Sequence, residues 1–325
     1  MKKPLILIVS SSAEEHSYGR VVSHLEKHGA RVLLWLTDIA IGSSRSFSIL
    51  ITEQGTVSIQ AGSVLVDVRD IDAAWYWKPN SFRVPGAEEN VSRQMTYVNE
   101  VTSLNRALWS VLPESIWLSS PLQLWRAERK FQQLLLAREV GFEIPRTMVS
   151  SDWSMIEKFM GAETQNLVVK MARGVLADQN HVMAMPTTLL ALPQRNALQG
   201  VVSPFPGIYQ PYLEKRREWR ITTVKEEAFP AAIYTNGKSR VDWRQSQTSN
   251  DVTFAKEDPP SLVLEYCVEY LRRSELGYGA FDLVEDEDGQ FFFLECNPSG
   301  QYSWLEELLG LPISGSLAAS LLPAQ

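Results

Sequence analysis

The chain has 325 residues, of which 45% are hydrophobic and 21% are charged, a balance that is ordinary for a soluble globular protein. Its formal net charge of −7 argues against nucleic acid as the main partner. No apolar run approaches the ~20 residues of a membrane span, and the run Leu5 to Val9 is too short for a signal peptide, so we expect a cytoplasmic protein with no membrane partner.

The first part of the chain predicts an α/β domain. Leu5 to Val9 is all apolar, as in a parallel strand that is covered on both faces. Residues 16–28 have helical spacing and end at Gly29, a helix C-cap signal, and Val32 to Leu36 follows as a second strand. We also expect a small hairpin over 47–69, a strand from Ala73 to Trp77 and a helix over about 88–112. No G-x-G-x-x-G loop is present, so no dinucleotide site is predicted here.

The rest of the chain predicts further helices and a unit rich in strands. Residues 121–140 read as one basic amphipathic helix that ends at Gly141, and residues 171–204 read as irregular. The other expected elements are strands at 147–149, 166–170, 208–212, 218–224, 229–234 and 251–254, and helices from Asp152, over 261–274 and over 303–322.

Near the C-terminus, apolar residues flank the pair Asp288-Gly289, a pattern that predicts a β-hairpin with a two-residue turn. With that turn Glu287 faces Gln290. The register further from the turn follows from this pairing.

In that register Asp282 lies directly opposite Glu295, and Asn297 points to the same face of its strand as Glu295. Two carboxylates about 5 Å apart across a sheet repel one another. A hard divalent cation removes the repulsion, and an oxygen set of Asp, Glu and Asn suits Mg²⁺. The hairpin therefore predicts a magnesium site, and such a metal usually arrives with a nucleotide. The alternative is an exposed hairpin whose carboxylates face water, but both acids are embedded in apolar sequence.

Basic residues elsewhere could meet the phosphates of a nucleotide. Lys170 closes an apolar strand, where a solvated strand end is the plainer interpretation, and Lys130 lies on a helix whose other basic residues suggest a solvated face. Glu218 and Arg220 share one strand face. Charged residues also alternate along a later segment, at Lys238, Arg240, Asp242 and Arg244. Arginine binds carboxylates and phosphates bidentately, but exposed charged strands remain an equal alternative.

Other candidate sites are weaker. His24 and His28 have an i, i+4 spacing that can bind zinc, but no third ligand is placed nearby, so surface histidines are expected. Cys267 and Cys296 are the only cysteines, which supports neither a disulfide framework nor a zinc site. No nucleophile elbow and no Walker A loop is present.

Taken in order, these residues resemble the pattern of ATP-grasp ligases from about residue 120 to the C-terminus. Within that family the chain is similar to the graspetide (microviridin-type) peptide macrocyclases, relatives of the ribosomal-protein glutamate ligases. Trp77 and Lys78 depart from the family pattern, which has two basic residues there, and Cys296 replaces an expected valine. The supporting phrases are Trp75 to Pro79, Gly141 to Thr147, Tyr209 to Lys215, Asp242 to Arg244, Leu294 to Glu306 and Gly310 to Ile313.

The resemblance implies an α/β chain with the ATP-grasp fold. Its three parts would be an N-terminal α/β (pre-ATP-grasp) domain over 1–118, a small central subdomain over 119–206 and a C-terminal α+β subdomain with the magnesium site over 207–325. The implied cofactors are ATP and Mg²⁺.

The resemblance also implies roles for individual residues. Lys130 and Lys170 would hold the ATP phosphates, and the segment from Gln210 to Leu213 would hold adenine through the Pro211 carbonyl and the Leu213 N–H. The other implied roles are metal binding by Asp282, Glu295 and Asn297, orientation of the substrate carboxylate and acyl phosphate by Arg220 and Arg244, and substrate binding by Lys215, Glu218 and Arg240.

The implied substrate is a ribosomal precursor peptide, with a leader and a core rich in Thr/Ser and Asp/Glu. Its side-chain carboxylates would be activated as acyl phosphates and then joined to Thr, Ser or Lys side chains as esters or amides. One alternative is an ATP-grasp carboxylate–amine ligase that adds an amino acid to a protein tail or cofactor, and another is a non-catalytic, nucleotide-dependent peptide-binding module. The oligomeric state stays open, with a homodimer as one option.

Overall fold

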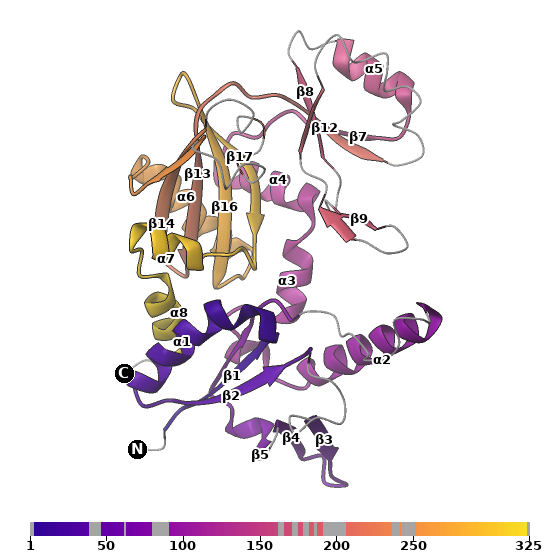
Figure 1. Ribbon diagram of the computed structural model, residues 1–325, viewed down its shortest axis with the longest axis vertical. Coiled ribbons are helices and arrows are strands. Elements are labelled where there is room, and N and C mark those ends of the chain that lie inside the picture. Colours follow the sequence, from indigo (N-terminus) through magenta and orange to yellow (C-terminus); the bar gives the residue numbers. More distant parts are fainter. Residues whose placement is uncertain are drawn as a thin grey trace.

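The computed structural model describes residues 3–38, 47–61, 63–79, 91–161, 166–170, 175–177, 182–184, 187–190, 206–235, 241, 243 and 251–323. Figure 1 shows a parallel sheet at one end of the molecule, a five-stranded sheet beside it and a small sheet at the other end. Within these ranges no helix is both long and apolar enough to cross a membrane. The domain boundaries after residues 118 and 206 stay predictions.

The N-terminal part is built on a three-stranded parallel sheet in the order β2-β1-β6. Strand β1 (Leu5–Ser10) is buried at every position, as its apolar sequence predicts. Gly29 adopts a left-handed φ of 82° just beyond α1, which confirms the predicted helix end. The other elements here are η1 (Ser12–Glu14), α1 (Glu15–Lys27), β2 (Arg31–Leu36), β6 (Ala73–Tyr76), an antiparallel sheet of β3 (Phe47–Ile51), β4 (Val57–Ala61) and β5 (Val64–Asp67), η2 (Val68–Asp70), α2 (Val91–Trp109) and η3 (Glu114–Ile116).

The prediction of one helix over 121–140 is wrong, because the chain breaks between α3 (Pro121–Ala127) and α4 (Lys130–Val140). Arg129 has an extended backbone there, with φ −80° and ψ 97°. The Gln133 side chain spans the break by donating to the carbonyl oxygen of Ala127 at 2.6 Å. As a result Lys130 becomes the first residue of a new helix.

The small sheet has the order β11-β8-β12-β7. Helix α5 (Trp153–Gly161) packs on it through Ile156 and Phe159. The strands are β7 (Met148–Ser150), β8 (Leu167–Lys170), β11 (Thr188–Leu190) and β12 (Gly207–Pro211). The prediction of an irregular segment over 171–204 is wrong for β11 and for the antiparallel pair β9 (Val175–Ala177) and β10 (Val182–Ala184).

The five-stranded sheet is antiparallel throughout, in the order β15-β14-β13-β16-β17. One face packs against α4 and α6, with Trp219, Phe281 and Phe293 in the core between them. The opposite face joins the N-terminal part and α8 through Tyr278 and Val224. The elements are β13 (Lys215–Val224), β14 (Glu227–Thr235), β15 (Val252–Ala255), α6 (Ser261–Arg273), β16 (Tyr278–Asp286), β17 (Phe291–Asn297), α7 (Ser303–Leu309) and α8 (Ile313–Leu321).

The predicted last helix over 303–322 is also divided, into α7 and α8. Gly310 ends α7 with a left-handed φ of 64°, and Pro312 follows it. A left-handed glycine followed by proline stops a helix, so this signal was present in the sequence.

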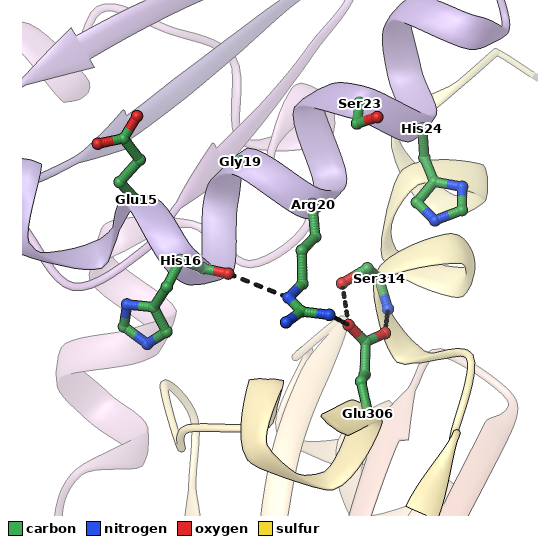
Figure 2. A pocket seen from close by; sticks show the side chains of 8 residues that line it. All are labelled: Glu15, His16, Gly19, Arg20, Ser23, His24, Glu306 and Ser314. Atoms are coloured by element: carbon green, nitrogen blue, oxygen red, sulfur yellow. Dashed lines mark hydrogen bonds and ion pairs between the residues drawn. The ribbon is translucent and has the colours of Figure 1, made fainter. Parts of the chain in front are cut away.

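Helix α1 meets α7 and α8 around an open hollow of about 420 Å³ (Figure 2). Arg20 on α1 lies 3.7 Å from a carboxylate oxygen of Glu306 and 2.5 Å from one of Glu307. Glu306 in turn accepts hydrogen bonds from the backbone N–H and the hydroxyl of Ser314. His24 lines this hollow. The lining residues come from α1 near the N-terminus and from α7 and α8 near the C-terminus.

Candidate active site

The centre of the site is the hairpin of β16 and β17, where Asp282 lies directly opposite Glu295 as predicted. Asn297 is paired with Ala280, two positions further along the same face. Both strands are held by the cores on either side of the sheet.

The loop that produces this register differs from the prediction. The predicted two-residue turn is wrong. The Asp286 N–H donates to the Gln290 carbonyl at 3.0 Å, which leaves a three-residue loop in which Gly289 has a φ of 77°. Leu294 is then an extra, bulged residue, because Leu283 pairs with Phe293 while Asp282 pairs with Glu295. The longer loop shifts the register by one residue and the bulge restores it.

Each of the two facing carboxylates is bonded to a cation. Arg220 lies opposite Asp282 on β13, and its Nη1 is 2.6 Å from the aspartate Oδ1. Lys130, at the start of α4, places its Nζ 2.6 Å from Glu295 Oε2. The Arg220 pair is nearly inaccessible, whereas the Lys130 pair is partly exposed. These cations relieve the repulsion between the acids.

The donor set fits a hard divalent cation. Two carboxylates and one amide oxygen lie on one face of the hairpin, and the Oδ1 of Asn297 is oriented by a 2.9 Å hydrogen bond from the Ser299 N–H. Among the described residues no group of three His, Cys, Asp or Glu side chains is placed to hold a metal ion. In these two ion pairs Arg220 contacts Oδ1 of Asp282 and Lys130 contacts Oε2 of Glu295, one oxygen of each carboxylate.

Next along β13, Lys215 and Glu218 form a buried ion pair, with the lysine Nζ 2.6 Å from the glutamate Oε1. Three residues apart in a regular strand, they would face opposite ways. A bulge between Lys215 and Arg217 places them together. Two of the three residues predicted to bind substrate, Lys215 and Glu218, are thus bonded to each other.

The opposite face of the same strands carries a second charged network. Arg217 binds Glu285 through Nε at 2.6 Å and Glu257 through Nη1 at 2.5 Å, and its guanidinium lies 4.8 Å from the Trp219 ring centroid. The Trp219 indole N–H also donates to Glu285 at 2.8 Å. This network fixes Arg217, which lies at the bulge, on the face of the sheet opposite the Lys215–Glu218 pair.

Apart from Lys130, the predicted nucleotide-binding residues lie on the small sheet or in the connection that follows it. Lys170 is the last residue of β8, opposite Ile208 on β12. The Gln210 amide donates to the Thr147 hydroxyl at 2.9 Å, so its side chain supports the segment rather than projecting from it. Pro211 ends β12, and Leu213 lies in the connection that leads into β13.

Two of the predicted arginines, Arg240 and Arg244, lie outside the described residues. Trp243 is described and buried, and its ring centroid is 5.5 Å from that of Trp304 and 5.7 Å from that of Phe254. Two phrases that carry the family resemblance therefore meet in the fold.

Sequence reasoning missed two residues at this site. Gln133 bonds the backbone of Cys296, between two of the predicted metal ligands. Lys78 has a left-handed φ of 42° and lies within electrostatic reach of Glu14 and Arg220. Lys78 was noted only as a departure from the family pattern, and no local signal predicts its backbone.

Comparison with solved structures gives matches over almost the whole chain. A RiPP-associated ATP-grasp ligase from Chryseobacterium gregarium, in complex with ADP and a leader and core peptide, is 23% identical with a TM-score of 0.86, covering 98% of this chain and 96% of that one. The macrocyclase MdnC of Microcystis aeruginosa MRC, bound with precursor peptide MdnA, is 24% identical with a TM-score of 0.83, covering 98% and 99%. The ATP-grasp ligase PsnB, complexed with a phosphomimetic variant of its minimal precursor, Mg and ADP, is 18% identical with a TM-score of 0.75, covering 99% and 98%.

No family model matches the chain, and a comparison with curated proteins by sequence gives no match either. The structural matches confirm the predicted fold class. The chain has the ATP-grasp fold.

Proposed function

We propose that this protein is an ATP-dependent peptide ligase that forms side-chain crosslinks in a ribosomal precursor peptide. The observation that carries the proposal is the facing pair of Asp282 and Glu295, with Asn297 on the same face. The fold supports it, because structures of similar fold hold ADP, magnesium and precursor peptides.

In the proposed reaction, a side-chain carboxylate of the peptide attacks the γ-phosphorus of ATP, giving an acyl phosphate and ADP. A Thr or Ser hydroxyl, or a Lys amine, of the same peptide then attacks that carbonyl carbon, loses its proton and expels inorganic phosphate. Each ester or amide formed in this way removes the elements of one water molecule from the peptide.

The chain's own residues would position the reactants and neutralise charge, as the chemistry requires. Asp282, Glu295 and Asn297 would hold Mg²⁺, which neutralises phosphate charge when bound. Lys130 and Lys170 would bind the phosphates, and the segment from Gln210 to Leu213 would bind adenine.

The substrate would meet the basic side of the site. Arg220 and Arg244 would orient the carboxylate and the acyl phosphate. Lys215, Glu218 and Arg240 would complete the substrate-binding surface.

The test is reconstitution with ATP, Mg²⁺ and a candidate precursor, which is any small peptide encoded near the gene that has a core rich in Thr/Ser and Asp/Glu. We expect the peptide to lose about 18 Da per crosslink, with one ADP released for each bond. In a parallel reaction that also contains free amino acids, a peptide that gains the mass of an added amino acid would favour the carboxylate–amine ligase instead. An unchanged peptide mass with no ADP release would reject the proposal.

A second test separates the metal site from the fold. Glu295→Gln should abolish crosslinking while the variant stays folded, because the substitution removes one of the two negative charges that would hold Mg²⁺. The matched control is Glu287→Gln on the exposed turn of the same hairpin, which should keep full activity. Retention of turnover by Glu295→Gln would exclude the proposed metal role.

A further inference from the structure

Lys78 occupies an unusual backbone conformation at the edge of the candidate site. It follows the end of β6, where the Trp77 N–H still donates to the Val9 carbonyl at 2.8 Å, and its φ is 42°. It also precedes Pro79, and residues before proline ordinarily have an extended backbone. A non-glycine residue persists in the left-handed region only where its surroundings hold it, and such residues gather at functional sites.

The surroundings that hold Lys78 are part of the joint between the parallel sheet and the five-stranded sheet. The Trp77 ring is fully buried, with its centroid 5.5 Å from that of Tyr278 and 5.4 Å from that of Tyr302. The Ser11 hydroxyl donates to the Lys78 carbonyl at 3.3 Å. Tyr278 lies on the same face of β16 as Asp282, so this packing directs Lys78 toward the face that carries the acids.

The Lys78 ammonium lies over the Trp77 ring, 5.6 Å from its centroid. The side chain is half-buried, and within the described residues it forms no ion pair. Burial lowers the pKa of Lys78, Glu14 opposes that effect and the like charge of Arg220 adds to it. Glu14 itself accepts a hydrogen bond from the Gln301 amide at 2.6 Å, and Arg220 is bonded to Asp282. An anion that binds near Lys78 would offset both the burial of its ammonium and the like charge of Arg220.

We propose that the Lys78 ammonium binds the peptide side-chain carboxylate that is to be activated, an inference that rests on the proposed function. Arg220 is only 7% exposed and is bonded to Asp282, so Lys78 is the more accessible of the two cations. The phosphates already have candidate partners in Lys130 and Lys170. The N-terminal part of the chain would thus contribute a substrate-binding residue, specific for acidic side chains.

The experiment measures binding and turnover of two peptides: the candidate precursor, and a copy whose core Asp and Glu are replaced by Asn and Gln. For Lys78→Met we expect the affinity for the acidic peptide to fall about 10- to 100-fold, as for the loss of a charged hydrogen bond. Its affinity for the amide peptide should change less than about twofold, and its affinity for ATP should not change. Lys78→Arg, which keeps the charge, should recover part of the loss.

Two control variants separate the ammonium group from the backbone. Lys225 also has a left-handed φ, of 49°, but it is exposed and its Nζ donates to the Ser320 carbonyl, so Lys225→Met should bind both peptides normally. Lys78→Gly removes the ammonium and relieves the backbone strain, so it should be at least as stable as the wild type yet bind the acidic peptide as weakly as Lys78→Met.

The possible outcomes are distinct. An unchanged affinity of Lys78→Met for the acidic peptide, or an equal loss for both peptides, would overturn the role of Lys78 while leaving the ligase intact. A wild-type protein that neither binds nor crosslinks the precursor would overturn the proposed function, and the inference with it.

Discussion

The Gln133 side chain on α4 hydrogen-bonds both backbone groups of Cys296 on β17: its Nε2 donates to the Cys296 carbonyl at 2.8 Å, and its Oε1 accepts from the Cys296 N–H at 3.2 Å. Strand β17 is the last strand of the sheet, so these backbone groups face no neighbouring strand. One side chain therefore supplies what a sixth strand would supply, at the residue between Glu295 and Asn297.

Replacing Gln133 with Leu should lower the free energy of unfolding by about 1–3 kcal/mol, because the Cys296 groups lose their partners while they stay buried. We also expect weaker Mg²⁺-dependent binding of a fluorescent ADP analogue, since Glu295 and Asn297 lose their support. Chemical denaturation and nucleotide titration measure the two effects. Gln132→Leu, on the exposed side of the same helix, is the control and should change neither. An unaltered Gln133→Leu protein would show that the two hydrogen bonds contribute nothing.

The loop of the hairpin supplies a second prediction. Gly289 has a φ of 77°, and a Cβ added there would meet nothing within 4 Å, so only the backbone conformation opposes a side chain. Gly289→Ala should therefore cost about 1–2 kcal/mol of stability. Gly161, near the end of α5, has the same open space without a left-handed backbone, so Gly161→Ala should be neutral or stabilising, by up to about 1 kcal/mol. Urea denaturation of both variants measures the two changes in the free energy of unfolding. Equal changes would contradict the prediction.

The hairpin also shows how far local sequence signals reach. The sequence predicted that Asp282 faces Glu295, yet it did so with a two-residue turn and no bulge. The Asp286 carboxylate accepts hydrogen bonds from the N–H groups of Asp288 and Gln290, which favours the longer loop. The bulge at Leu294 then keeps Phe293 in the core and both acids on the other face. Burial, and not the turn residues, determines the register.

Other parts of the site depend on contacts between distant segments, which no local pattern contains. Lys130 was predicted to meet phosphate, but its bond to Glu295 joins residues 165 positions apart. The break before Lys130 likewise has no proline or glycine to announce it, whereas the break at Gly310 and Pro312 does. The strands, most helices and the two acids that face each other across the hairpin could therefore be predicted. The ion-pair partners of the charged side chains could not.

At the hollow shown in Figure 2, Arg20 on α1 has two acidic partners on α7, of which the figure labels Glu306. Arg20 approaches both Glu306 and Glu307, whose side chains are 11% and 58% exposed. Only Glu306 also accepts two hydrogen bonds from Ser314, at the start of α8. Glu306→Ala should therefore lower the free energy of unfolding by about 1–3 kcal/mol, and Glu307→Ala by less than about 1 kcal/mol, as for an exposed ion pair. Thermal and urea unfolding measure both variants. Equal losses of unfolding free energy in Glu306→Ala and Glu307→Ala would refute the prediction.

The network behind β13 predicts a dependence of stability on pH. Burial by itself raises the pKa of Glu285, but hydrogen bonds from Arg217 and Trp219 outweigh it and hold this pKa below its usual value of 4.5. A carboxylate with a lowered pKa in the folded state stabilises the fold above the pKa of the unfolded chain, and this stabilisation is lost as the pH falls through the folded pKa.

Glu285→Gln should therefore lower the free energy of unfolding at pH 7 by about 1–3 kcal/mol, because Arg217 and Trp219 lose a charged acceptor. The difference between wild type and variant should shrink as the pH is lowered below about 4.5, where the unfolded wild type takes up its proton. Urea denaturation of both proteins across that range measures the difference, with Glu226→Gln in the exposed turn before β14 as the control. A difference that stays constant with pH would mean that hydrogen-bond geometry, and not the charge of Glu285, stabilises this strand.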